Sequence, residues 1–425
     1  MTERPPSYPG YSGEPPRRTG LARRTARAAA RRVDAAFSRN GPAFRQLAVS
    51  WSANVAGDTL VAVGLAGTLF FSVPSSEARG NVALYLLLTI APFAVVVPVL
   101  GGVFSRFKGI YRGSIIVASF LRTLLALVMM LGLTTIWLYP LAFGMLVLSR
   151  LYGISKNSLL PIALAEPVAL VSANAQLARI GILAGAVVLP LGALAVQIDP
   201  AVALALAAAF FFVSTFTAFG LPNPRRAQPV ESDILDTPWP QRPPVPRRAI
   251  GLSRLATAGV RLLNGFLLLL LAFEFRDTDA RAFDFAALIA AAGLGYGLAS
   301  MVSPVLERRI REEPMVVAAL ALEAAAAFIA GQFFGLAAAA ALAAAAGLAW
   351  GTAKFAFDAM LQASVPPDQS GKAFIRSETV FQLAWVIGAI IPVVLTVDAE
   401  VGLALAGVAA LTAQTVFVSG LLVER

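Results

Sequence analysis

The chain has 425 residues, of which 58% are apolar and only 14% are charged. A soluble protein averages about 45–50% apolar and about 25% charged residues, so this chain lacks the charge that a soluble enzyme of its size needs on its surface. Neither cysteine nor histidine occurs, which excludes disulfides, thiolate and imidazole metal sites, Ser-His triads and histidine proton relays.

The first 46 residues differ in composition from the rest of the chain. Residues 1–18 are rich in Pro, Gly and Ser, which is typical of a disordered segment. Residues 20–39 combine arginines with helix formers, which indicates either a basic helix on an anionic membrane surface or a solvated tail that only enforces orientation. The first apolar run starts far inside and is too long for a signal peptide, so we expect none.

Twelve apolar segments follow, most of them long enough to cross a bilayer as a helix. The predicted spans are 47–71, 82–104, 113–133, 137–155, 175–197, 201–221, 252–275, 283–303, 314–333, 335–353, 379–397 and 401–422. Between the sixth and seventh lies a stretch rich in proline and arginine, which predicts a flexible cytoplasmic linker. We therefore expect an all-α membrane protein with a tail at 1–46, six-helix bundles at 47–221 and 252–425, and the linker at 222–251.

The basic residues lie almost entirely on one side of the predicted spans. If the tail is inside, the predicted outside loops contain only Arg79, Arg276 and Arg281 as basic residues. The positive-inside rule therefore predicts that both termini are cytoplasmic. The net charge of +10 then reflects topology, whereas nucleic-acid binding would need basic grooves interleaved with aromatic residues.

The two predicted bundles match each other at one roughly constant offset along the chain. Ser105-Arg106 falls on Glu307-Arg308, and Asp58 in the first span falls near Arg261 in the seventh. Two pseudo-symmetric six-helix bundles related by an axis along the membrane normal are a known transporter design, with the substrate bound between them.

The segment after the second predicted span carries the most specific motif. Gly101, Ser105 and Arg106 resemble the Gly-x-Leu-x-Asp-Arg pattern that the major facilitator superfamily carries there, with Ser105 in place of the aspartate. The second copy has Glu307 and Arg308 in the acidic and arginine positions. Over roughly residues 44–422, the chain is similar to bacterial exporter-type members of that superfamily whose substrate is unassigned.

This resemblance implies the major facilitator fold, with twelve transmembrane helices in two bundles. It also implies that the five motif residues form gating loops, and that the first, fourth, seventh and tenth spans line a central cavity.

Three polar residues are predicted at bilayer depth in these spans. An ionisable residue there costs about 2.5–3.5 kcal/mol, so it is a candidate functional residue. Asp58, with Asn54 one turn earlier, indicates a proton-coupling or substrate site, or else a structural carboxylate paired with a neighbouring helix. Arg261 is expected to pair with Asp58 across the bundles, to hold an anionic group, or to snorkel toward a boundary.

Other charged residues are predicted to support these sites. We expect Arg122 and Arg150 to be structural, and Lys354 and Asp358 to form an i,i+4 pair or a gate. Glu378 is interpreted as favouring a helix N-terminus. Glu323 lies in an otherwise apolar span, and the sequence predicts no role for it.

Without an ATP-binding loop in the sequence, a secondary carrier is the simplest interpretation. We expect a proton-coupled antiporter that exports a lipophilic or amphipathic small molecule across the bacterial inner (plasma) membrane by alternating access. The alternatives are a lipid or lysolipid carrier, and a non-transporting scaffold with a degenerate carrier fold. No enzyme is expected, because no convergent catalytic groups occur in the loops. We expect no cofactor and no metal. The expected partners are a small-molecule or lipid substrate, protons and membrane lipids, but not nucleic acid. The protein is expected to be a monomer.

Overall fold

The computed structural model describes residues 40–69, 110–131, 137–164, 170–223, 247–277, 282–395 and 397–422. Several predictions lie outside these residues. They are the basic tail before residue 40, the span 82–104, the gating residues Gly101, Ser105 and Arg106, and most of the linker.

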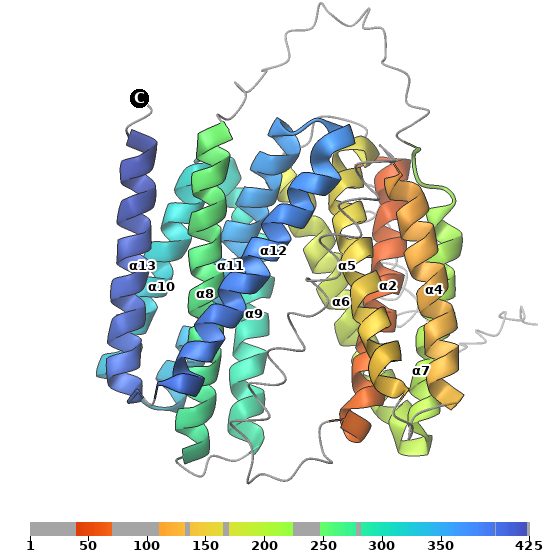
Figure 1. Ribbon diagram of the computed structural model, residues 1–425, viewed down its shortest axis with the longest axis horizontal. Helices are drawn as coiled ribbons and strands as arrows, with labels where there is room; N and C mark the ends of the chain where they lie inside the picture. Colours follow the sequence, from red (N-terminus) through yellow and green to blue (C-terminus); the bar gives the residue numbers. More distant parts are fainter. Residues whose placement is uncertain are drawn as a thin grey trace, which may run out of the picture.

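Eleven α-helices make up the described part of the chain (Figure 1). They are α2 (Pro42–Leu69), α4 (Tyr111–Leu131), α5 (Leu138–Ala163), α6 (Leu170–Ile198), α7 (Pro200–Ala218), α8 (Arg247–Asp277), α9 (Ala282–Glu307), α10 (Glu312–Gln332), α11 (Leu336–Ser364), α12 (Pro367–Val394) and α13 (Ala399–Leu422). Within the described residues, nine of them, α4 and α6–α13, are long and apolar enough to cross a membrane. The protein is therefore a multi-pass helical membrane protein.

Each described helix coincides with a predicted span, but several helix ends differ from the prediction. Helix α11 continues to Ser364, α12 already begins at Pro367, and α8 begins at Arg247, inside the predicted linker. The charged residues Lys354 and Glu378 fall in the added turns, where they pair inside the protein. Hydropathy treats such residues as loop residues because it does not distinguish a charge buried in protein from one in water.

The helices gather in two groups that lie side by side (Figure 1). Helices α2 and α4–α7 form one group, called here the N-half, and α8–α13 form the other, the C-half. Contacts between the halves join α6 to α9 and α11, and α5 to α12. The pseudo-symmetry between the halves stays a prediction.

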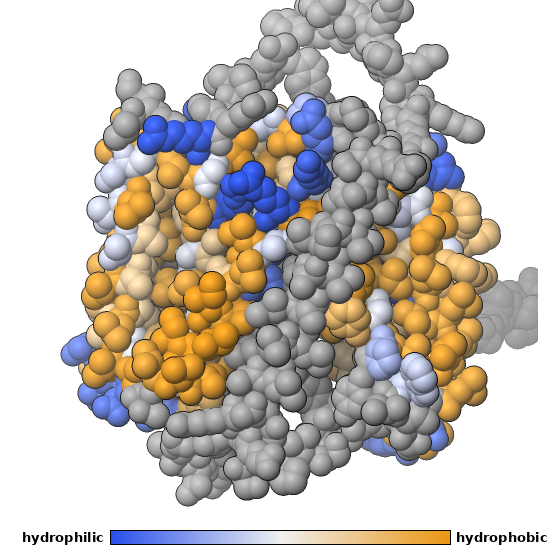
Figure 2. All heavy atoms as spheres, viewed as in Figure 1, coloured by the Kyte–Doolittle hydropathy of each residue, from blue (hydrophilic) through white to orange (hydrophobic). Residues whose placement is uncertain are grey.

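The flanks of the molecule are apolar, and hydrophilic residues gather toward the ends of the helices (Figure 2). Large side chains such as Leu121 and Leu124 of α4, and Leu405 and Val408 of α13, are exposed. Exposed apolar surface of this extent is unfavourable in water and fits contact with lipid.

Two helix pairs in the C-half are packed backbone to backbone through glycine. A Cβ atom at Gly265 of α8 would overlap the main-chain carbonyl of Trp385 in α12, and one at Gly388 would overlap that of Leu262. A Cβ at Gly295 of α9 would likewise overlap the carbonyl of Ala344 in α11. Small residues at such positions allow close approach of membrane helices.

We expect Gly295→Ala to destabilise the protein by about 1–3 kcal/mol, because the added methyl must push α9 and α11 apart. The same helix supplies two matched controls, since a Cβ at Gly293 or Gly297 would meet nothing within 4 Å. Thermal unfolding of the purified variants in detergent checks this. A Gly293→Ala or Gly297→Ala variant as unstable as Gly295→Ala would contradict the packing argument.

Candidate functional site

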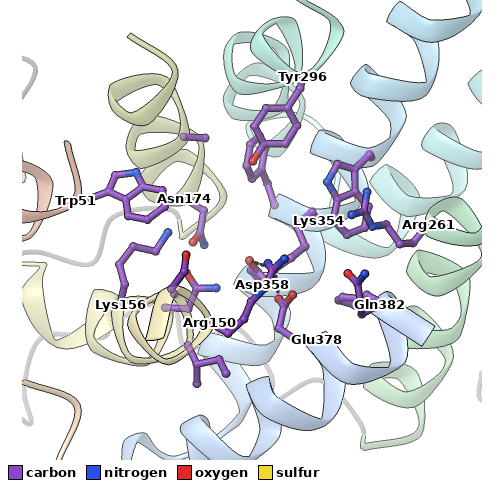
Figure 3. Close-up of a pocket in the computed structure, with 18 residues that line it drawn as sticks. Trp51, Arg150, Lys156, Asn174, Arg261, Tyr296, Lys354, Asp358, Glu378 and Gln382 are labelled. Carbon is purple, nitrogen blue, oxygen red and sulfur yellow. Dashed lines mark hydrogen bonds and ion pairs between the residues drawn. The ribbon is translucent and has the colours of Figure 1, made fainter. Parts of the chain in front are cut away.

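A polar cavity of about 340 Å³ lies between the two halves (Figure 3). Helices α2, α5 and α6 of the N-half and α8, α9, α11 and α12 of the C-half contribute to its wall. Its polar and aromatic lining includes Trp51, Arg150, Lys156, Asn174, Arg261, Tyr296, Trp350, Lys354, Asp358, Glu378 and Gln382. We call it the central cavity.

The central cavity lies deep within the helices. Arg150 lies near the middle of α5, which begins at Leu138, Lys354 precedes the end of α11 at Ser364, and Glu378 follows the start of α12 at Pro367. At 1.5 Å per residue, these separations place the charged side chains roughly 15–20 Å from the nearer helix end. This is about half the thickness of a bilayer core.

Lys354 is the centre of an ion-pair triad on the C-half wall. Its Nζ atom lies 2.5 Å from Asp358 Oδ2 and 2.9 Å from Glu378 Oε1. The predicted i,i+4 pair of Lys354 and Asp358 is therefore confirmed. Glu378 lies well inside α12 and pairs across to α11, which differs from the predicted role at a helix N-terminus. The triad has two carboxyl groups for one ammonium group.

Two other cations of the central cavity lie against aromatic rings. Lys156 Nζ is 4.2 Å from the ring centroid of Trp51. The guanidinium carbon of Arg261 is 4.6 Å from the Trp350 ring and 5.7 Å from the Trp385 ring. Cation–π contacts of this kind stabilise a desolvated charge without neutralising it.

Two apolar pockets adjoin the central cavity. The first, of about 340 Å³, lies in the C-half between α8, α9 and α11, and Arg261 lines both this pocket and the central cavity. The second, of about 420 Å³, lies along α2 and α6 and shares Trp51 and Tyr296 with the central cavity. We call them the C-half pocket and the N-half pocket.

At one end of the helices, the two halves are joined by hydrogen bonds. Glu307, in the last turn of α9, accepts from the main-chain N–H groups of Val171 (3.2 Å) and Ser172 (3.0 Å) and from the Ser172 hydroxyl (2.8 Å) in the first turn of α6. Asn174 donates to the side-chain oxygen of Gln362 at 2.7 Å, from α6 to α11. We call this region the closed end.

Both apolar pockets lie on the far side of the central cavity from the closed end. Along α11, Gln362 belongs to the closed end, Lys354 to the central cavity and Leu342 to the C-half pocket. Along α6 the order is Asn174, Ala178 and then Gly185 of the N-half pocket. The hollow in the described helices therefore extends away from the closed end.

The predicted pairing of Asp58 with Arg261 is wrong. Arg122 of α4 is fully buried, forms an ion pair with Asp58, and donates to Asn54 Oδ1 at 2.6 Å. Its guanidinium also lies 4.0 Å from the ring centroid of Phe211. Asn54 and Asp58 are one turn apart on the same face of α2, so one guanidinium reaches both.

The pairing changes where the predicted residues lie. Asp58 and Asn54 are absent from the described lining of the central cavity, whereas Arg261 belongs to it. Whether Asp58 takes up a proton stays a prediction, but its ion pair favours a structural role. Arg150, Lys354 and Asp358, which were predicted as supports, line the central cavity.

The two predicted gating residues that the structure describes lie at different places. Glu307 is buried at the closed end, whereas Arg308 is exposed. The acidic position of the motif is thus the one that joins the halves.

Glu323 is buried in α10, and its Oε1 atom accepts from the amide of Asn264 in α8 at 3.4 Å. Its Oε2 atom has no hydrogen-bond partner among the described residues. In the N-half, Asn54 of α2 bonds Arg122 of α4 in a corresponding way. A polar contact thus joins α2 to α4 in the N-half and α8 to α10 in the C-half, as the predicted repeat implies.

Sequence reasoning missed several cavity residues, notably Lys156, Trp51 and Tyr296. Lys156 was counted as a loop residue because the predicted span ended just before it, although α5 continues to Ala163. No sequence pattern could have indicated the contact between Trp51 of α2 and Lys156 of α5, because only the packing of the helices brings these two residues together.

No family model matches the chain. The Mycobacterium leprae uncharacterized protein ML2143 is 29% identical over 395 residues, which are 84% of this chain and 68% of that protein. The Mycobacterium tuberculosis uncharacterized protein Rv0876c is 38% identical over 149 residues, which are 33% of this chain and only 27% of that protein.

Two solved structures resemble the chain over most of its length. A bacterial homologue of the iron transporter ferroportin, in an outward-facing state, superimposes with a TM-score of 0.67 at 18% identity, over 89% of this chain and 99% of its own. The human organic anion transporter MFSD10 (TETRAN) superimposes with a TM-score of 0.63 at 15% identity, over 88% of this chain and 98% of its own. At such identities the likeness shows the fold.

Proposed function

We propose that this chain, which has the fold of the major facilitator superfamily, is a secondary transporter that works by alternating access. One observation carries the proposal: a polar cavity at mid-membrane depth lies between two helix groups, and the described hydrogen bonds between these groups all lie at one end of the helices. A site between two halves that can part at either end is the arrangement such transporters use.

The orientation follows from the positive-inside rule, which assigns the closed end to the cytoplasm. The linker, the first turn of α2 and the end of α13 then lie on the cytoplasmic side. Under this assignment the protein is in an outward-facing arrangement in the inner membrane, with both termini cytoplasmic. The bacterial ferroportin homologue, solved in an outward-facing state, supports this interpretation.

The proposed transport is proton-coupled efflux of an amphipathic small molecule. The two apolar pockets beside a charged cavity suit a molecule with one polar and one apolar part. The Lys354 triad is the proposed proton site, because a proton on Asp358 or Glu378 would leave the remaining pair electrically neutral. Asp58, in contrast, is already balanced by Arg122.

Proteoliposomes with an imposed pH gradient test this function. We expect the wild type to couple proton movement to transport of an amphipathic solute. Glu378→Gln should abolish gradient-driven transport while solute exchange at equal pH persists, because the glutamine cannot take up and release a proton. Glu313→Gln is the matched control, since Glu313 lies outside the central cavity beside Arg311.

Two results would contradict this proposal. Full gradient-driven transport by Glu378→Gln would remove the triad as the coupling site. If the wild type moved neither protons nor any solute from a panel of lipophilic cations, lipophilic anions and lysolipids, the non-transporting scaffold would replace the carrier.

A further inference from the structure

The charges that line the central cavity do not balance. Its lining includes four basic side chains, Arg150, Lys156, Arg261 and Lys354, but only two acidic ones, Asp358 and Glu378. Both acidic groups already bind Lys354. The lining of the central cavity therefore carries a positive excess in a region where an uncompensated charge is unfavourable.

Lys156 and Arg261 are the cations best placed to receive a ligand. They come from opposite halves, Lys156 from α5 and Arg261 from α8, and both line the same cavity (Figure 3). Their described close contacts are the ring faces of Trp51, Trp350 and Trp385. An aromatic ring holds the cation in position but leaves its other N–H donors available for hydrogen bonds to an anion.

The C-half pocket and the central cavity meet at Arg261, which lines both. Apart from Arg261 and Asn264, its lining consists of apolar side chains such as Leu267, Leu271 and Phe285. Each of the two spaces measures about 340 Å³, which is within the usual range for a small-molecule site. One arginine thus stands at the boundary between a cationic space and an apolar space.

We propose that the transported substrate is an amphipathic anion. Its acidic head group, a carboxylate, sulfonate or phosphate, lies in the central cavity against Arg261, and its apolar part lies in the C-half pocket. Lys156 contributes to the positive charge of the same cavity. This substrate class rests on the proposed transport function. The positive excess of the cavity favours such an anion, whereas a neutral or cationic molecule gains nothing from the two cations.

Equilibrium binding to the full chain in zwitterionic lipid nanodiscs tests this class without requiring transport. The probes share a ten-carbon chain and differ in the head group: decanoate and decylsulfonate are anionic, decanol is neutral, and decyltrimethylammonium is cationic. Because three tryptophans line the two spaces, tryptophan fluorescence reports occupancy. We expect both anions to bind at least about tenfold more tightly than the neutral and cationic probes.

Charge variants assign the effect to the two cations. Arg261→Gln should weaken decanoate binding about tenfold, and Lys156→Gln should weaken it by a smaller factor; both should leave decanol binding unchanged. Arg261→Lys should recover part of the affinity, which separates loss of charge from misfolding. Lys372→Gln is the control, because Lys372 is an exposed lysine on α12 outside both spaces; it should bind decanoate like the wild type.

The source of the anion is decided by one further probe. Lysophosphatidylglycerol binding at least as tightly as decanoate would identify a lipid head group as the natural form, and weaker binding would identify a free organic anion. Equal affinity for the three head-group charges, or decanoate binding that Arg261→Gln does not change, would overturn the inference. Anion binding without transport under any gradient would overturn only the proposed function, and transport of cations without anion binding would overturn only the inference.

Discussion

Asp58→Ala is expected to lower the free energy of unfolding by about 3–5 kcal/mol, because it leaves a buried arginine without its counter-ion. The Arg122 side chain is 0% exposed, whereas that of Asp58 is 38% exposed. Arg122→Met should therefore cost less, since the carboxylate left behind is partly exposed and still accepts a hydrogen bond from Asn54, whereas the guanidinium left behind by Asp58→Ala is fully enclosed. We therefore expect Asp58→Ala to lose more stability than Arg122→Met.

Chemical unfolding of the variants in nanodiscs measures these differences. The double variant Asp58→Asn/Arg122→Met should be more stable than Asp58→Ala, because no unpaired charge remains. Lys372→Gln, which changes an exposed residue of α12, should change stability by no more than about 0.5 kcal/mol. An Arg122→Met variant less stable than Asp58→Ala would contradict the expectation that the unpaired arginine costs more than the unpaired carboxylate.

The double variant also decides whether Asp58 carries the coupling proton. If Asp58 is structural, Asp58→Asn/Arg122→Met should retain transport driven by a pH gradient. Loss of that transport in a well-folded double variant would return Asp58 to the coupling site.

Glu307→Ala is expected to open the closed end and shift the protein toward an inward-facing state. The carboxylate accepts three hydrogen bonds from Val171 and Ser172, and it lies at the N-terminus of α6, where a negative charge is favoured. Hydrogen bonds to a charged group contribute about 1.5–3 kcal/mol. A loss of about 2 kcal/mol changes the ratio of the two states roughly thirtyfold.

Distance measurements between spin labels check this shift. The chain contains no cysteine, so Arg45→Cys on α2 and Lys372→Cys on α12 place one label on each half, at exposed positions near the closed end. The label distance should lengthen in Glu307→Ala. Glu313→Gln, which removes an acid from the same end of the C-half without touching α6, should leave the distance unchanged; equal distances in all three proteins would rule out Glu307 as a latch.

The helices could be predicted from the sequence far better than the site. Hydropathy located every described helix, because each span is apolar enough to be recognised against its loops. It ended the spans before Lys354 and Lys156, and began one after Glu378, because these charges lie in helix interiors that face protein. The acidic residue of the second motif copy, Glu307, was found because a motif fixes its position in the chain.

The pairing inside the membrane could not be predicted in the same way. Depth along a span placed Asp58 and Arg261 at comparable levels, but depth does not say toward which neighbour a side chain turns. The choice of Arg122 as the partner depends on the packing of α2 and α4 against the same helix, α7. The choice of tryptophan for Arg261 depends on the packing of α8 against α11 and α12.

The glycine contacts of the C-half have a mechanical consequence. Helix α8, which carries Arg261, touches the backbone of α12, which carries Glu378; α9, which carries Tyr296, touches that of α11, which carries Lys354. Backbones in direct contact have no side-chain layer between them, so we expect the two helices of each pair to move together. Under the proposed alternating access, we expect the charged groups of the C-half to keep their spacing, and the distance from them to Lys156 of the N-half to change.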